Sequence, residues 1–139
     1  MKVLLDTNII LDILLQREPH YLHAIEVLRL AERGQIECHI TANSITDIFY
    51  ILRKYLSDPK DRELAIRNIL QLVNIVGITK KDIIKSFELQ YTDFEDALQT
   101  QCAKKLKADY IITRNEKDFK SLTVKVVSAE QFIEIAKNF

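Results

Sequence analysis

Four aspartates fall where an expected strand ends or an expected helix begins: Asp6, Asp47, Asp96 and Asp118. A carboxylate at a helix start has an ordinary role, because it accepts hydrogen bonds from free backbone amides. Asp6 differs, since Thr7 and Asn8 follow it and could already cap the next helix. Several carboxylates in one place repel each other unless a cation neutralises them, and Mg²⁺ and Mn²⁺ prefer oxygen ligands. If the fold gathers these aspartates, they predict a site where a metal ion activates water.

The elements that must position these aspartates alternate between short apolar runs and amphipathic helices. Residues 3–5, 38–41, 110–112 and 124–127 are expected strands, and 73–76 is either a strand or the end of a helix. Strands separated by helices favour right-handed crossovers and a parallel sheet that is covered on both faces. The sequence therefore predicts an α/β fold, a three-layer α/β/α sandwich with a central parallel sheet of about four to five strands.

Several helix ends carry local signals. Pro19 suits the first turn of a helix, and Gly34 stands just past the expected end of that helix. Residues 92–95 match a capping box in which Thr92 caps the next helix. Ser128 is expected to cap the last helix.

The expected sheet places most of the acids at one edge. In parallel α/β sheets the working site lies outside the carboxyl ends of the strands. Asp6 follows the first expected strand, and Asp47 lies in the helix after the second. Asp93 and Asp96 open a later helix, and Asn115 follows the strand after it. We therefore expect these side chains to converge at the carboxyl edge of the sheet.

Composition limits the classes of protein that fit. The 139 residues suit one domain over 1–139, and 20 basic residues balance 20 acidic ones, so the formal net charge is zero. With two glycines in the chain there is no Gly-rich phosphate loop or dinucleotide fingerprint, which disfavours ATP-driven and NAD-dependent chemistry. Cys38 and Cys102 are expected to be buried and reduced. A secretory signal and a membrane-spanning run are not expected, so the predicted location is cytoplasmic.

Four segments, taken in order, are similar to PIN domains, and especially to the bacterial subgroup of toxins from toxin–antitoxin pairs. They are DTNIILDILLQREP (6–19), SITDIFYILRK (44–54), DFEDALQTQCA (93–103) and ADYIITRNEKDF (108–119). The resemblance covers nearly the whole chain. It implies a metal-dependent endoribonuclease that hydrolyses RNA phosphodiesters with Mg²⁺ or Mn²⁺. It also implies an antitoxin protein as a partner and a homodimer as the assembly.

The resemblance assigns roles residue by residue. The expected catalytic acids are Asp6, Asp47, Asp96 and Asp118. The expected metal ligands are Asp6, Asp96, Asp93 and Asp118. The expected substrate contacts are Asn8, Thr113, Arg114 and Asn115. Two positions depart from the family pattern, because Asp47 stands where many members have Glu and Asn115 where many have Asp.

These departures leave a second function open, a catalytically degenerate PIN-like module that binds RNA or protein without cutting. A phosphotransferase or receiver-like enzyme, which would use Asp6 as nucleophile or metal ligand, fits the remaining sequence poorly. For the phosphate backbone, Arg114 is the expected contact because a guanidinium grips phosphate bidentately, with Arg53 and Lys54 as second choices. The lysines at 104, 105 and 107 are expected to form a solvated helix face.

Overall fold

The protein forms a five-stranded, fully parallel sheet in the order β3-β2-β1-β4-β5. The computed structural model describes residues 1–119 and 124–139, without the side chain of Asp118. The strands are β1 (Lys2–Leu5), β2 (Glu37–Thr41), β3 (Val73–Val76), β4 (Tyr110–Ile112) and β5 (Lys125–Val127). Residues 73–76 are thus a strand, and the predicted parallel sheet is confirmed.

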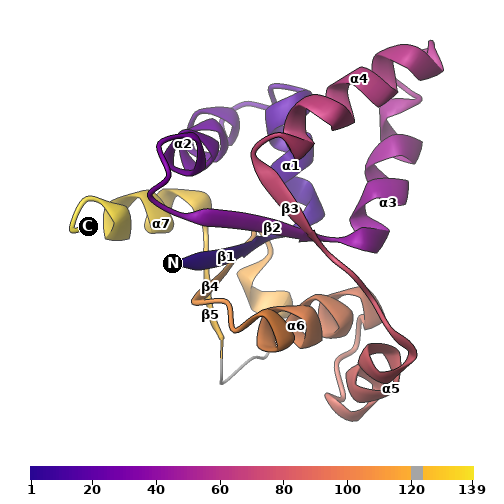
Figure 1. The fold of residues 1–139 in the computed structure, drawn as a ribbon, viewed down its shortest axis with the longest axis vertical. Helices are drawn as coiled ribbons and strands as arrows, with labels where there is room; N and C mark the ends of the chain where they lie inside the picture. Colours follow the sequence, from indigo (N-terminus) through magenta and orange to yellow (C-terminus); the bar gives the residue numbers. More distant parts are fainter. Residues whose placement is uncertain (120–123) are drawn as a thin grey trace.

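The helices lie on both faces of this sheet. They are α1 (Thr7–Leu14), α2 (Tyr21–Glu32), α3 (Ala42–Leu52), α4 (Pro59–Leu70), α5 (Lys80–Glu88), α6 (Phe94–Leu106) and α7 (Ala129–Ala136), with a short 3₁₀ helix, η1 (Glu116–Asp118). Helices α1, α2 and α7 cover one face, and α6 covers the other with α5 packed against it (Figure 1). The α/β/α sandwich predicted from the alternation of elements is confirmed.

Strand β1 lies at the centre of the sheet and shows why the fold has two cores. Val3 and Leu5 face the core beneath α1 and α2, whereas Leu4 faces the core beneath α6. Successive side chains of a strand point to opposite faces, so a strand covered on both sides must be apolar throughout. The run that the sequence offers at 3–5 meets this requirement.

Two predicted helix starts are displaced. Pro19 precedes α2, because residues 17–21 close a separate turn in which Tyr21 N donates to Arg17 O over 2.8 Å. Asp93, not Thr92, caps α6, and its Oδ1 accepts from Asp96 N over 3.2 Å. Either Thr92 or Asp93 could cap a helix that begins here, and in the structure the cap is Asp93.

Other local predictions hold. Gly34 follows the end of α2 with a φ of 74°, a left-handed conformation that glycine adopts without a Cβ clash. Ser128 caps α7 in a capping box with Gln131. Cys38 and Cys102 are free and buried, and burial raises their thiol pKa values to about 12 and about 11, so both stay protonated at neutral pH. No helix in the described part is long and apolar enough to cross a membrane.

Candidate active site

An acidic cleft of about 300 Å³ opens at the carboxyl edge of the sheet. The described residues that line it are Asp6, Thr7, Asn8, Asp47, Tyr50, Ile51, Asp93, Glu95, Asp96 and Asn115. Five of these carry a carboxyl group, and none carries a basic side chain. The lining comes from the β1–α1 junction, from α3, from the start of α6 and from the turn after β4. The fold thus gathers acids that are far apart in the sequence.

Asp6 is the most firmly held of these acids. Its backbone N–H extends the sheet ladder by donating to Ile112 O over 2.9 Å, which fixes the residue directly after β1. The hydroxyl of Thr113 donates to Asp6 Oδ2 over 2.7 Å, and Gln99 Nε2 donates to Oδ1 over 3.0 Å. A carboxylate oxygen can accept more than one bond, so these two bonds orient the carboxylate while lone pairs remain for another ligand.

A buried chain of hydroxyl groups sets the relative position of α1 and α3. Thr7 Oγ1 donates to Ser44 Oγ over 3.0 Å, and Ser44 Oγ lies 2.9 Å from Thr41 Oγ1. This chain joins the first residue of α1 to the first turn of α3. It thereby fixes the position of Asp6, which precedes Thr7, relative to Asp47, which lies one turn after Ser44; both aspartates line the cleft.

The start of α6 contributes three further acids. Asp93 caps the helix through Oδ1, and this bond does not use Oδ2. Asp96 lies in the first turn, where the positive end of the helix dipole stabilises a negative charge. The side chain of Thr100 donates to the backbone oxygen of Asp96 over 2.9 Å and tightens this turn.

Glu95 is a site residue that the sequence analysis did not single out. Burial raises its carboxyl pKa, and the charges of Asp47, Asp6 and Asp93 raise it further, while a hydrogen bond with Thr7 acts in the opposite direction. The acids of the cleft are therefore close enough for their negative charges to repel one another. The acids at both ends of the segment DFED (93–96) indicate that Glu95 lies near them. The capping box expected over residues 92–95, however, gives Glu95 a structural role as the partner of Thr92.

The remaining predicted residues have different positions. Asn8 and Asn115 line the cleft, and Asn115 N donates to Thr113 Oγ1 over 3.0 Å. Thr113 itself is fully buried, so it orients Asp6 and does not reach the cleft where a substrate would contact it. The side chain of Asp118 lies outside the described residues, so its predicted role as a catalytic acid and ligand stays a prediction.

Arg114 lies away from the acidic cleft. It lines a separate hollow of about 230 Å³, and its Nε is 2.9 Å from Oδ2 of the fully buried Asp12. Burial raises the pKa of Asp12, although Arg114, His20 and Arg17 counteract this effect. The guanidinium thus neutralises a buried carboxylate, which differs from the expected contact with a phosphate beside the catalytic acids.

The donor set of the cleft suits a hard divalent cation. Every acid that lines it offers carboxylate oxygens, the ligands that Mg²⁺ and Mn²⁺ prefer. Within the described residues, however, no three His, Cys, Asp or Glu side chains already converge on one point. An ion here would be held by one or two carboxylates and would keep several waters, as Mg²⁺ usually does.

Known proteins resemble this chain over most of its length. Residues 2–117 match the family model described as PIN domain. The chain is 30% identical to Ribonuclease VapC1 of Aquifex aeolicus (strain VF5) over 141 residues, which cover 96% of this chain and 94% of that protein.

Solved structures repeat the fold. A toxin–antitoxin complex from Klebsiella pneumoniae contains a chain that superposes with a TM-score of 0.70 at 26% identity, covering 91% of this chain and 97% of that one. VapBC2 from Rickettsia felis, bound to a DNA fragment from its promoter, gives a TM-score of 0.70 at 18% identity with the same coverage. Mycobacterium tuberculosis VapC20, described as a sarcin–ricin loop cleaving toxin, gives 0.62 at 13% identity, covering 78% and 86%. With the matching family model and the acidic cleft at the expected edge, the chain belongs to the PIN-domain family.

Proposed function

We propose that this protein is a ribonuclease that hydrolyses RNA phosphodiesters with Mg²⁺ or Mn²⁺ held in the acidic cleft. The observation that carries the proposal is Asp6, a buried carboxylate whose side-chain partners among the described residues are neutral. Its charge therefore remains available to a cation. The relative named Ribonuclease VapC1 supports RNA as the substrate.

In this proposal Asp6 and Asp96 bind the ion directly, and Asp93 is an auxiliary ligand that acts through one of the waters of the ion, with the Oδ2 that its helix cap does not use. A bound divalent cation lowers the pKa of its water and offsets negative charge on the phosphoryl oxygens. Asp47 and Glu95 face the same space and would hold or orient water through hydrogen bonds. Asn8 and Asn115 offer amide groups that can donate to the substrate without adding charge.

The first test is incubation of purified protein with a mixed RNA pool, with Mg²⁺, with Mn²⁺ and with EDTA. The proposal predicts cleavage that EDTA abolishes and that Asp6→Asn removes. Asp109→Asn is the matched control, because Asp109 lies at the opposite edge of the sheet and accepts from Lys2 N over 2.9 Å. RNA binding without metal-dependent cleavage of any RNA in the pool would favour the degenerate binding module instead.

We further propose that the protein is the toxin of a toxin–antitoxin pair, acting on RNA in the cytoplasm. The relative from Klebsiella was solved as a toxin–antitoxin complex. On this chain, the exposed Tyr50 of α3 lines the cleft, and Tyr55, which follows α3, is exposed as well. These side chains offer an apolar surface for an antitoxin segment. Co-purification with the product of a neighbouring small reading frame, with loss of cleavage in the complex, tests this role.

A second exposed apolar surface suits a homodimer. Ile83, Ile84 and Phe87 of α5 are exposed, and Phe87 stacks on Phe94 of α6 with ring centroids 5.0 Å apart. An apolar helix face in water favours association. Sedimentation of the wild type and of Phe87→Ser should show a dimer that the substitution weakens.

A further inference from the structure

A groove of about 660 Å³ lies between α5 and α6, separate from the acidic cleft. Its described lining consists of Thr79, Lys81, Asp82, Lys85, Glu88, Leu89, Gln101, Lys104 and Lys105. Both helices contribute lysines to it. Lys104, Lys105 and Lys107 are exposed, as the sequence predicts for a solvated helix face, and Lys105 in addition pairs with Asp82. We call Lys81, Lys85, Lys104 and the space between them the lysine groove.

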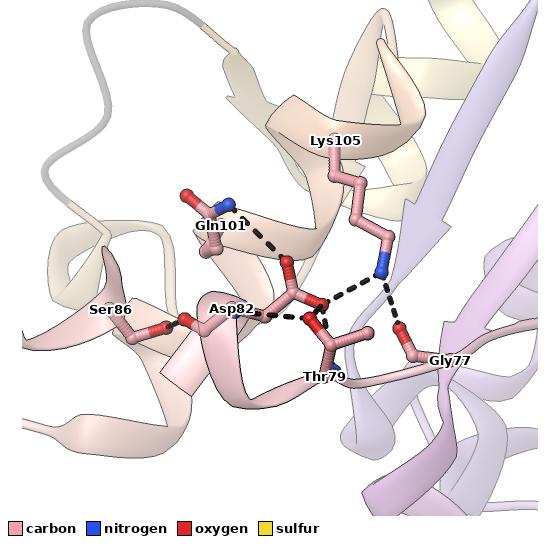
Figure 2. Close-up of polar contacts among 6 residues, drawn as sticks. All are labelled: Gly77, Thr79, Asp82, Ser86, Gln101 and Lys105. Atoms are coloured by element: carbon pink, nitrogen blue, oxygen red, sulfur yellow. Dashed lines mark hydrogen bonds and ion pairs between the residues drawn. The ribbon is translucent and has the colours of Figure 1, made fainter. Parts of the chain in front are cut away.

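A buried polar network fixes the shape of this groove. Figure 2 shows Asp82 at its centre, where Oδ2 accepts from Lys105 Nζ over 2.7 Å and Oδ1 accepts from Gln101 Nε2 over 3.5 Å. Lys105 Nζ also donates to Gly77 O over 2.9 Å, and Thr79 forms a capping box with Asp82. These bonds tie α5 and the β3–α5 connection to α6, and thereby join the two walls of the groove.

The same network determines which charges remain. Asp82 is 3% exposed and is neutralised by Lys105. Lys81, Lys85 and Lys104 are exposed and have no ion-pair partner among the described residues, and Glu88 is the other acid of the lining. Three free cations against one acid leave the groove positive, in a chain whose formal net charge is zero.

The position of the lysine groove relative to the acidic cleft suggests its ligand. Lys104 lies eight residues after Asp96 on the same helix, which corresponds to about 12 Å along the axis. The described lining of the cleft has five carboxyl groups and no basic residue, so by itself this lining repels a polyanion. Arg114 is occupied by Asp12. A phosphate backbone that enters the cleft is therefore stabilised by cations nearby. Arg53, whose guanidinium lies over the ring of the cleft-lining Tyr50, is one, and α5 and α6 supply three more.

We propose that the lysine groove binds backbone phosphates of the single-stranded RNA whose scissile bond lies in the acidic cleft; this inference rests on the proposed ribonuclease function. Ammonium groups act as point charges toward phosphate, so binding is independent of base sequence and sensitive to salt. The groove sets affinity for the strand, whereas the cleft carries the chemistry.

The test replaces Lys81, Lys85 and Lys104 together by Gln and measures binding of a fluorescent single-stranded RNA at several salt concentrations. EDTA is present, so that no cleavage occurs. Neutralising each phosphate contact lowers the slope of log affinity against log salt by about 0.7 for a single strand, so the triple variant should lose about 2. The control is Lys60→Gln, Lys107→Gln and Lys137→Gln, three exposed lysines outside the groove with the same change in net charge.

The inference is overturned if the groove variant keeps the wild-type slope, or if the control variant loses as much as the groove variant. Lysine-dependent binding of a polyglutamate peptide without RNA binding would overturn it too, in favour of an acidic protein partner. Melting curves of both variants establish that they are folded. Cleavage by the wild-type protein is measured separately with Mg²⁺. If the wild type cleaves RNA but the groove variant keeps the wild-type salt slope, the groove proposal fails and the ribonuclease proposal stands. If the groove variant has a lowered salt slope but the wild type does not cleave RNA, the ribonuclease proposal fails and RNA binding by the groove stands.

Discussion

Asp6 and Asp82 are both buried aspartates, with 5% and 3% exposure, yet only one of them has a positively charged partner among the described residues. Asp82 meets the ammonium group of Lys105, and its charge is used up within the fold. Asp6 meets a hydroxyl and an amide, so its charge is oriented but not neutralised. Asp12, which pairs with Arg114, belongs with Asp82. Burial alone therefore does not distinguish the two aspartates, whereas the charge of their hydrogen-bond donors does, and it is the reason why we propose Asp6 and not Asp82 as a metal ligand.

The largest expected effect is on cleavage by Asp6→Asn. Loss of a residue that merely supports a ligand typically costs about 10–100-fold in metal affinity or activity, so loss of the ligand itself should cost more than about 100-fold. The free energy of unfolding should stay equal or increase, because one of several mutually repelling charges is gone. Cleavage assays and urea unfolding measure the two effects. A strongly destabilised variant would place Asp6 with Asp82 as a structural group.

Thr113→Val should have the next largest effect. It removes the hydroxyl that donates to Asp6 Oδ2 while keeping the shape of the buried side chain. Metal affinity should fall by about 10–100-fold, because the carboxylate loses its fixed orientation. Thr46→Val is the matched control, since the hydroxyl of Thr46 donates to Asn43 O on the exposed face of α3. Equal metal affinities in both variants would show that Asp6 needs no such support.

Asp82→Asn should reverse the pattern seen for Asp6. The substitution leaves Lys105 without its carboxylate partner and weakens the joint between α5 and α6. We expect the free energy of unfolding to decrease by about 1–3 kcal/mol, with metal-dependent cleavage of a short RNA retained. Urea unfolding and cleavage assays check the two expectations. Lost cleavage with unchanged stability would contradict the division between the two aspartates.

The smallest expected effect is a pH dependence of stability that belongs to Asp82. Burial alone would raise its pKa, but hydrogen bonds from Lys105, Thr79 and Gln101 lower it to about 2. Since an unfolded aspartate titrates at about 3.9, Asp82 stabilises the fold above about pH 4 and loses this effect as the pH falls through about 2. The unfolding free energies of wild type and Asp82→Asn should converge over this range. A constant difference would disprove the linkage.

Much of the fold follows from local signals in the sequence, because strands covered on both faces need unbroken apolar runs such as those at 3–5 and 110–112. The apolar pattern does not predict helix α5. Its buried residues are the polar Asp82 and Ser86, while Ile83, Ile84 and Phe87 are exposed. A search for apolar residues at helical spacing therefore misses a helix whose buried face is polar and is held to α6 by an ion pair.

The candidate site is predictable in part for a similar reason. Asp6, Asp47 and Asp96 lie next to strand ends or helix starts, which sequence periodicity locates. The pairing of Arg114 with Asp12 and of Thr113 with Asp6 joins residues that are remote in the chain, and only the packed structure shows which partner each group meets. Residue types thus predict a site, whereas the tertiary contacts decide which charges are free.

The most direct test of this account is a calorimetric titration of Mn²⁺ into wild type, Asp6→Asn and Asp82→Asn. The account predicts that wild type and Asp82→Asn bind the ion with similar affinity, because Lys105 already neutralises Asp82, and that Asp6→Asn does not bind measurably. Binding to Asp6→Asn with wild-type affinity would contradict it, since the unneutralised charge of Asp6 would then play no part in holding the cation.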